Sequence, residues 1–149
     1  SQQGYILELT GVQPPTSDII FTQYYEGSSN NKWLEITNIG DSTVDLSTYQ
    51  VTTWSNADAE AWKADGAGSV DASYSLDLAG VSLDAGQSYV IANPSAALPY
   101  SSSLADATSS ITYFNGNDAL VLYTDPTGYL TSNIADAIAF TNSGFEGSM

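Results

Sequence analysis

The chain has 149 residues, and seventeen acidic residues against two basic ones, Lys32 and Lys63, give it a formal net charge of −15. A surface this negative excludes the usual mode of binding to nucleic-acid phosphates and anionic membranes, which requires a basic face. The sequence also lacks cysteine, histidine and arginine, which excludes disulfide bonds, thiolate or imidazole metal sites, serine–histidine triads and arginine phosphate clamps. The acidity is typical either of solubility in a salty medium or of divalent-cation binding.

Short β-prone runs, each bounded by turn residues, occupy the first half of the chain. Apolar and polar side chains alternate in these runs, as they do in half-buried strands. The pattern predicts strands at residues 19–25, 33–37, 44–46 and 49–54. Residues 55–72 differ, because they are rich in Ala, Asp and Gly and show no strand period. We expect a long loop there, with a short helical turn at 59–64.

The second half of the chain continues in the same way. Strands are predicted at residues 73–78, 88–93, 111–114, 119–124 and 134–140, with a second polar loop at 94–107. Asn115-Gly116 lies between two of these runs, and Asn-Gly between strands is a strong signal for a β-hairpin. Many short strands without a helical period predict one all-β domain, built as a two-sheet sandwich or a barrel.

The predicted strands also set the expected domain boundaries. Residues 1–18 precede the first predicted strand and are interpreted as an N-terminal extension or a first edge strand. Residues 19–141 form the β-sandwich domain, and residues 142–149 are assigned to a C-terminal tail. The sequence begins without an initiator Met or a signal segment and stops without a closing signal. We therefore expect it to be part of a longer multidomain chain, with the tail truncated.

Four sequence blocks stand out, GSSNNKWLEITN at residues 27–38, VDLSTY at 44–49, LDAGQSYVIAN at 83–93 and FNGNDALVL at 114–122. In this order they resemble the signature of bacterial lamin-tail domains. The stretch IADAI at 134–138 is loosely similar to the closing strand of the family. Any one block is weakly specific, whereas four in order are specific. Asn117 departs from the family pattern, which often has Asp at that position.

This resemblance implies an immunoglobulin-like β-sandwich of two mostly antiparallel sheets with about seven to nine strands. It also implies a setting outside the cell or on its surface, where such domains accompany secreted nucleases, phosphatases and other enzymes. No catalytic residues are assigned to the domain itself in that family. The resemblance therefore implies a non-catalytic accessory or binding module of a larger protein.

Oxygen-rich side chains gather at two predicted loop tips. Glu26 and Asn30 belong to one tip, and Asn115 and Asp118 to the other. Calcium takes about six to eight oxygen ligands from carboxylates, amides and carbonyls, so these four residues are the candidate ligands and calcium is the candidate ion. Turn chemistry alone also accounts for Asn and Asp at loop tips, and no known calcium-loop spacing is present. We favour the turn interpretation.

Aromatic residues offer a second candidate site. Trp54 and Trp62 flank a loop of small residues, and a ring with a polar edge suits a half-dry recognition surface. They are the candidate ligand-binding residues for a sugar or a protein partner, and the alternative is that they anchor the core or the loop. Lys32 is expected to meet a carboxylate of a neighbouring strand, such as Asp136.

Three functions follow from these observations, in order of preference. The first is a non-catalytic module that tethers or positions a partner enzyme, or binds a surface polysaccharide or protein. The second is a calcium-stabilised structural or adhesive module. The third is a glycosidase-type enzyme with a pair of carboxylates, although nothing in the spacing singles out such a pair. No nucleic-acid partner and no membrane association are expected.

Overall fold

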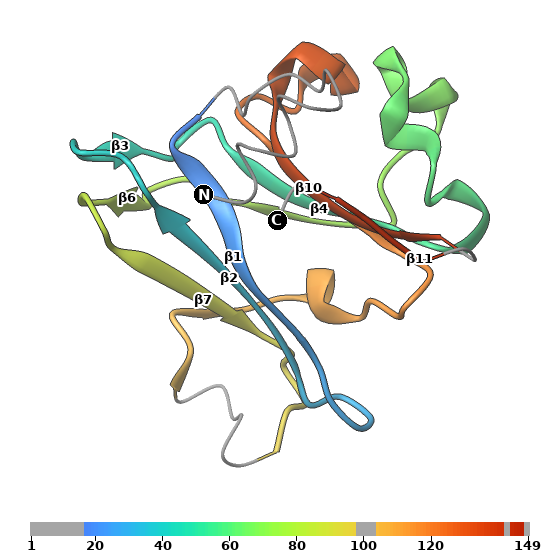
Figure 1. The fold of residues 1–149 in the computed structure, drawn as a ribbon, viewed down its shortest axis with the longest axis horizontal. Coiled ribbons are helices and arrows are strands. Elements are labelled where there is room, and N and C mark those ends of the chain that lie inside the picture. The colour runs from blue at the N-terminus through green and yellow to red at the C-terminus, as the bar shows by residue number, and fades with distance from the viewer. Residues whose placement is uncertain (1–16, 98–103, 142–143, 148–149) are drawn as a thin grey trace.

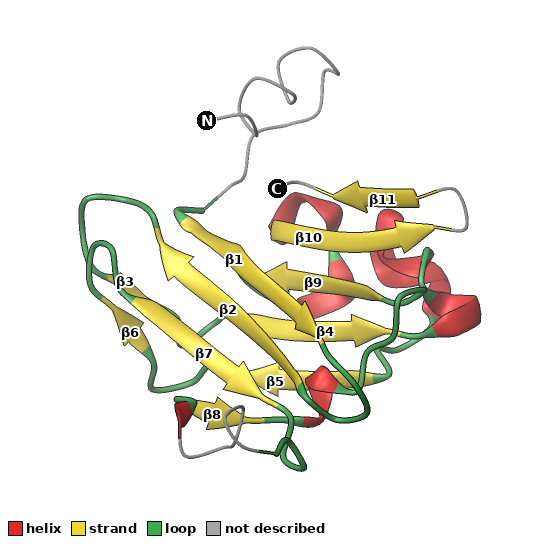
Figure 2. Cartoon of the chain, turned by 60° about the horizontal axis from the view of Figure 1, so that its bottom comes forward, coloured by secondary structure: helices red, strands yellow, loops and turns green. Residues whose placement is uncertain are grey.

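The computed structural model describes residues 17–97, 104–141 and 144–147, which fold into two main layers of strands (Figures 1 and 2). The four-stranded sheet has the order β1 (Ile19–Glu26), β2 (Lys32–Asn38), β7 (Ser88–Ala92) and β8 (Ala107–Thr108). The five-stranded sheet has the order β11 (Gly144–Gly147), β10 (Ile134–Thr141), β9 (Ala119–Tyr123), β4 (Gln50–Trp54) and β5 (Tyr74–Asp77). A small ribbon pairs β3 (Val44–Asp45) with β6 (Ser82–Leu83). Neighbouring strands are antiparallel except β7 and β8, so the predicted sandwich of mostly antiparallel sheets is confirmed.

The main core lies between the two sheets and follows from the alternation of side chains along each strand. In β2 every second residue is buried, and Leu34 and Ile36 are fully buried. They belong to one cluster with Val51 of β4 and Leu120 and Leu122 of β9. Because successive side chains of a strand point to opposite faces, each sheet contributes one apolar face to this core.

A second apolar cluster lies on the outer face of the five-stranded sheet. It contains Trp54, Val121 and Tyr123, and Ala67 and Trp62 of the loop after β4 pack onto it. Residues 55–72, predicted as a loop with one helical turn, form three short 3₁₀ helices, η1 (Asn56–Asp58), η2 (Ala61–Lys63) and η3 (Asp65–Ser69). The loop therefore covers the sheet, which explains why all five residues of β9 are buried.

The segment between β8 and β9 corrects one prediction. Residues 111–114 were expected to form a strand of a hairpin, but η5 (Ser110–Thr112) lies there instead, and β9 pairs with β4 and β10. This segment crosses from the four-stranded to the five-stranded sheet, and Ile111 and Phe114 enter the main core. Burial of two apolar side chains three residues apart favours a turn of helix over an extended strand.

The C-terminal boundary needs a second correction. Residues 142–149 were assigned to a tail, yet Gly144–Gly147 forms β11 and pairs antiparallel with β10. Backbone hydrogen bonds hold this strand, so the weak side-chain pattern of a Gly-rich stretch did not reveal it. Two further 3₁₀ helices, η6 (Thr127–Tyr129) and η7 (Thr131–Asn133), precede β10. In the part of the chain described above, no helix is long and apolar enough to cross a membrane.

One polar contact joins the two sheets. The buried Asp136 of β10 accepts a hydrogen bond from the backbone N–H of Phe21 in β1 at 2.9 Å, and another from the N–H of Ala137 at 2.9 Å. The Phe21 N–H lies beside a register shift in the β1–β2 ladder. The carboxylate of Asp136 therefore satisfies a donor at an irregular point of the four-stranded sheet.

Candidate functional site

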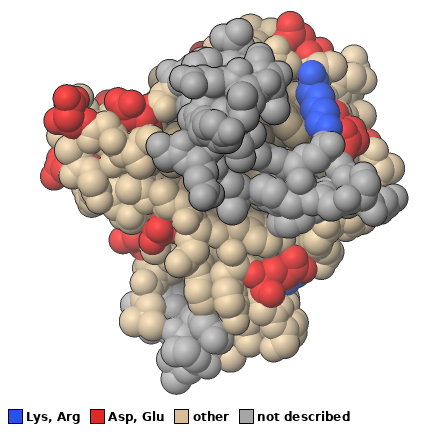
Figure 3. Space-filling model, viewed as in Figure 1, with Lys and Arg blue, Asp and Glu red and all other residues tan. Residues whose placement is uncertain are grey.

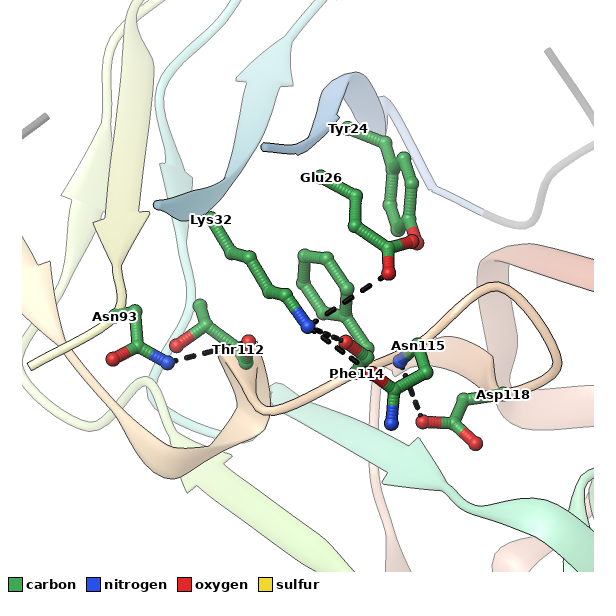
Figure 4. Close-up of polar contacts among 8 residues, drawn as sticks. All are labelled: Tyr24, Glu26, Lys32, Asn93, Thr112, Phe114, Asn115 and Asp118. Carbon is green, nitrogen blue, oxygen red and sulfur yellow. Dashed lines mark hydrogen bonds and ion pairs between the residues drawn. The ribbon is translucent and has the colours of Figure 1, made fainter. Parts of the chain in front are cut away.

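A network of polar groups surrounds the buried Lys32, the first residue of β2 (Figure 4). Its side chain is only 9% exposed. The ammonium donates hydrogen bonds to the carbonyl of Phe114 and to Asn115 Oδ1, the latter at 3.3 Å, and lies 3.7 Å from Glu26 Oε1. The Phe114 ring centroid is 5.7 Å from Lys32 Nζ. A buried charge requires such partners, because an isolated one is costly to desolvate.

The β1–β2 hairpin brings Glu26 and Lys32 together. The two residues face each other in the strand register, and the loop between them closes through a hydrogen bond from Gly27 N–H to the Asn31 carbonyl at 2.8 Å. A Cβ on Gly27 would lie 2.7 Å from that carbonyl oxygen. Only glycine fits this close approach without a shift of the backbone.

Tyr24 holds the other side of the Glu26 carboxylate. Its hydroxyl donates to Glu26 Oε2 at 2.7 Å, and its ring lies 4.6 Å from the ring of Phe114. Burial, together with the hydrogen bond to Glu26 and the charges of Glu26 and Asp118, raises the pKa of the Tyr24 phenol well above its ordinary value. Tyr24 therefore stays protonated and continues to donate its hydrogen bond across the usual pH range.

Asp118 fixes the loop that carries Asn115. The carboxylate is buried, and it accepts hydrogen bonds from the backbone N–H of Asn115 at 2.7 Å and of Asn56 at 3.0 Å. Oδ2 accepts the N–H of Asn115 and Oδ1 accepts the N–H of Asn56. The carboxylate therefore links the turn before β9 to the start of the loop after β4. This is the turn chemistry that the sequence analysis favoured for Asp118.

The four predicted calcium ligands therefore do not share one role. Glu26 and Asn115 direct oxygens at Lys32, Asp118 accepts two backbone N–H groups, and the carbonyl of Asn30 accepts the N–H of Lys32 at 2.9 Å. Over the described ranges, no group of three or more Asp or Glu side chains could hold a metal ion. The cation beside the oxygens of Glu26 and Asn115 is the ammonium of Lys32, which pairs with Glu26 and not, as predicted, with Asp136.

A calcium titration tests what this arrangement implies for metal binding. We expect calcium and magnesium, each added after EDTA at matched ionic strength, to raise the melting temperature equally, because both ions only screen the net charge. A true calcium site would raise stability further, by about 2.7 kcal/mol at a hundredfold excess over Kd. A rise specific to calcium would contradict our expectation and make Glu26 and Asp118 the first residues to replace.

The two tryptophans lie in different surroundings. Trp54 is fully buried in the second cluster, where its indole N–H donates to Thr52 Oγ1 at 2.9 Å and its ring meets Tyr129 edge-on at 4.9 Å. The prediction that Trp54 binds a ligand is therefore wrong, since β4 is buried on both faces. Trp62 is half-buried, its indole N–H donates to the Ala59 carbonyl at 2.8 Å, and its role in binding stays a prediction.

Several carboxylates accept hydrogen bonds in turns. These bonds lower the pKa of the carboxylates, whereas a general acid needs a raised pKa. Hydrogen bonds from Ser47, Thr131 and Thr127 lower the pKa of Asp45, Asp65 and Asp125, respectively. On the face drawn in Figure 3, acidic side chains lie in small separate groups over different parts of the surface.

One surface feature was not singled out from the sequence. Tyr74, at the start of the edge strand β5, and Tyr113, just after η5, are 39% and 38% exposed, with ring centroids 6.1 Å apart. We call these two residues the tyrosine pair. Both lie within predicted strands, at residues 73–78 and 111–114. The only available signal was their polar neighbours, Ser73 and Ser75 beside Tyr74 and Asn115 near Tyr113.

Comparison with known proteins agrees with the sequence blocks. The family model described as Lamin Tail Domain matches residues 12–144, which is most of the chain. No curated protein matches the chain. The resemblance drawn from the four blocks is thereby confirmed, and so is the immunoglobulin-like sandwich that it implied.

Proposed function

This chain belongs to the lamin tail domain family, and on that premise we propose that it is a non-catalytic module that attaches a larger extracellular or cell-surface protein to a neutral polysaccharide. An immunoglobulin-like domain is consistent with a non-catalytic role. The polar groups around Lys32 are hydrogen-bonded to its ammonium, and hydrogen bonds from neighbouring residues lower the pKa of Asp45, Asp65 and Asp125. These features support binding over turnover.

The observation that carries the proposal is the tyrosine pair. Large aromatic side chains that remain more than a third exposed are suited to contact with a ligand, because a tyrosine supplies apolar area together with a hydroxyl. The centroids of the two rings are 6.1 Å apart, and the ring planes are inclined by 48° to each other. Both rings can therefore contact one extended ligand. Sugar rings have an apolar face and polar edges, which matches this combination.

Charge narrows the ligand class to neutral polymers. The chain carries a net charge of −15, which repels polyanions such as nucleic acids or sulfated glycans. The residues on either side of Tyr74 are Ser73 and Ser75, which are exposed and carry uncharged hydroxyl groups. Hydroxyls and aromatic rings together favour a neutral glycan over a charged one.

Retention of the chain by neutral polysaccharides tests this function. We expect the chain to bind at least one of cellulose, chitin, xylan or mannan in a pull-down assay. The double variant Tyr74→Ala/Tyr113→Ala should lose about tenfold or more in affinity, because each aromatic contact contributes about 0.5–1.5 kcal/mol. Both tyrosines are exposed, so this variant should keep the melting temperature of the parent chain.

Trp62→Ala is the matched control, since it removes the other predicted aromatic contact. It should bind as tightly as the parent chain. Loss of binding in Trp62→Ala alone would move the recognition surface to η2. Retention of the double variant, or failure of the parent chain to bind any neutral polymer, would overturn the proposal and favour a protein partner.

A further inference from the structure

We propose that Lys32 and Asn115 react with each other to form an intramolecular amide bond, with Glu26 as the proton acceptor. The three side chains supply an amine, a carboxamide and a carboxylate, which are the groups that such a reaction needs. All three converge on Lys32 Nζ, at 3.3 Å from Asn115 Oδ1 and 3.7 Å from Glu26 Oε1. The inference concerns a covalent cross-link and is independent of the polysaccharide proposal.

The fold holds the amine against the carboxamide. Lys32 Nζ donates to the carbonyl of Phe114, the residue directly before Asn115, so its amine lies beside the start of that side chain. The backbone N–H of Asn115 is in turn held by Asp118 at 2.7 Å. Fixing two reactants at this separation can replace a slow bimolecular step with a fast internal one.

The amine is buried, which favours loss of the charges. The Lys32 side chain is nine-tenths buried and lies over the Phe114 ring, which packs on Tyr24. Transfer of one proton from Lys32 to Glu26 turns an ion pair into two neutral groups, which are less costly to bury than separated charges. The resulting free amine is the nucleophile.

The proposed reaction balances without any oxidant or co-reactant. The Lys32 ammonium passes a proton to Glu26, and the free Nζ attacks Asn115 Cγ to form a tetrahedral intermediate. Glu26 carries a proton back to Nδ2, the Cγ–Nδ2 bond breaks, and ammonia leaves and takes up the second proton from Nζ as ammonium. One C–N bond forms and one breaks, and Glu26 ends as the carboxylate with which it began.

The product suits the same site. Nζ of the new amide keeps one N–H, which can still donate to the Phe114 carbonyl. Figure 4 shows Asn115 Nδ2 on the side away from Lys32, and Asn115 is an exposed residue, so ammonia has a path to solvent. The bond would join the β1–β2 hairpin to the segment that crosses to β9, across a sequence separation of 83 residues. In a chain without cysteine, it would serve as a disulfide does.

Mass and digestion together test the proposal, because the chain contains only two trypsin sites, Lys32 and Lys63. The purified chain should weigh about 17 Da less than its sequence requires, the mass of one ammonia lost to the nucleophile. After denaturation, trypsin should cut only at Lys63, and residues 1–63 and 64–149 should stay joined. A full sequence mass with three separate peptides would overturn the proposal.

One side reaction needs its own control, because Asn115-Gly116 can lose ammonia by closing a succinimide on the Gly116 nitrogen. That product has the same mass, but trypsin would still release three peptides, and this result would also overturn the proposal. Lys32→Ala and Asn115→Ala should both regain the full mass.

The role of Glu26 is tested with a matched pair of variants. Glu26→Gln should retain the full mass and yield three peptides while circular dichroism shows a folded chain. Glu60→Gln removes the carboxylate that pairs with Lys63 at 2.6 Å and should cross-link like the parent. Cross-linking in Glu26→Gln at the parent rate would remove Glu26 from the mechanism.

Discussion

Replacing Trp54 with Ala should lower the free energy of unfolding by about 3–5 kcal/mol, the range for loss of a large buried aromatic side chain. Trp54 is fully buried, and it packs with Val121 and Tyr123 of β9 and edge-on against Tyr129. Its removal leaves a cavity under the loop after β4 and withdraws the hydrogen bond to Thr52 Oγ1. Urea denaturation followed by circular dichroism measures the loss.

Two variants separate the causes of that loss. Trp54→Phe keeps most of the ring but not the indole N–H, so it should cost less, about 1–2 kcal/mol. Trp62→Ala removes a half-buried ring from the margin of the same cluster and should cost less than Trp54→Ala. Equal losses for Trp54→Ala and Trp62→Ala would contradict the burial of Trp54 and return it to the binding surface.

Replacing Asp136 with Ala should cost about 2–4 kcal/mol, because it deprives two backbone donors of their acceptor. The N–H groups of Phe21 and Ala137 each donate to this buried carboxylate at 2.9 Å. Phe21 lies on β1 and Asp136 on β10, so the variant also removes a polar contact between the two sheets. Hydrogen exchange should show faster exchange of the Phe21 amide, in addition to the lower denaturation midpoint.

Asp136→Asn provides the graded control. The amide retains one acceptor oxygen, so it can satisfy one donor and should lose about half as much stability. Asp125→Ala removes an exposed carboxylate that caps Thr127 and should shift the midpoint much less. A loss in Asp136→Ala no larger than that in Asp125→Ala would show that the contact between β1 and β10 does not stabilise the sandwich.

Much of the fold could be predicted from local pattern. Strand β2 shows why, since Leu34 and Ile36 alternate with Glu35 and Thr37 and the burial follows that alternation. Turn residues on either side mark where the strand begins and ends. The all-β fold class could therefore be predicted from the pattern of adjacent residues, together with sequence blocks specific to one family.

The failed predictions share a physical cause. Residues 111–114 have strand-forming side chains, but their place between two sheets requires a turn that buries Ile111 and Phe114. Trp54 ends a strand whose outer face is covered by the loop after it, and a sequence does not reveal which faces of a strand are covered. In both cases burial against distant segments outweighed local preference.

The candidate site was found only in part for the same reason. Glu26, Asn115 and Asp118 were singled out as oxygen-rich residues, and they do lie at one end of the sandwich, around or beside Lys32. Their partners could not be derived, because Lys32 and Asn115 are 83 residues apart and meet only through the crossing segment. The exposure of the tyrosine pair likewise depends on which segments leave β5 at an edge.

The sequence by itself determined the all-β class, most strand positions, the family and the absence of cysteine, histidine and arginine, because these depend on residue identity and short-range pattern. Only the tertiary structure decided that Trp54 is a core residue, that Asp136 joins the two sheets and that Lys32 faces Glu26 and Asn115. These contacts depend on sheet order and on which faces are covered, and long-range packing sets both.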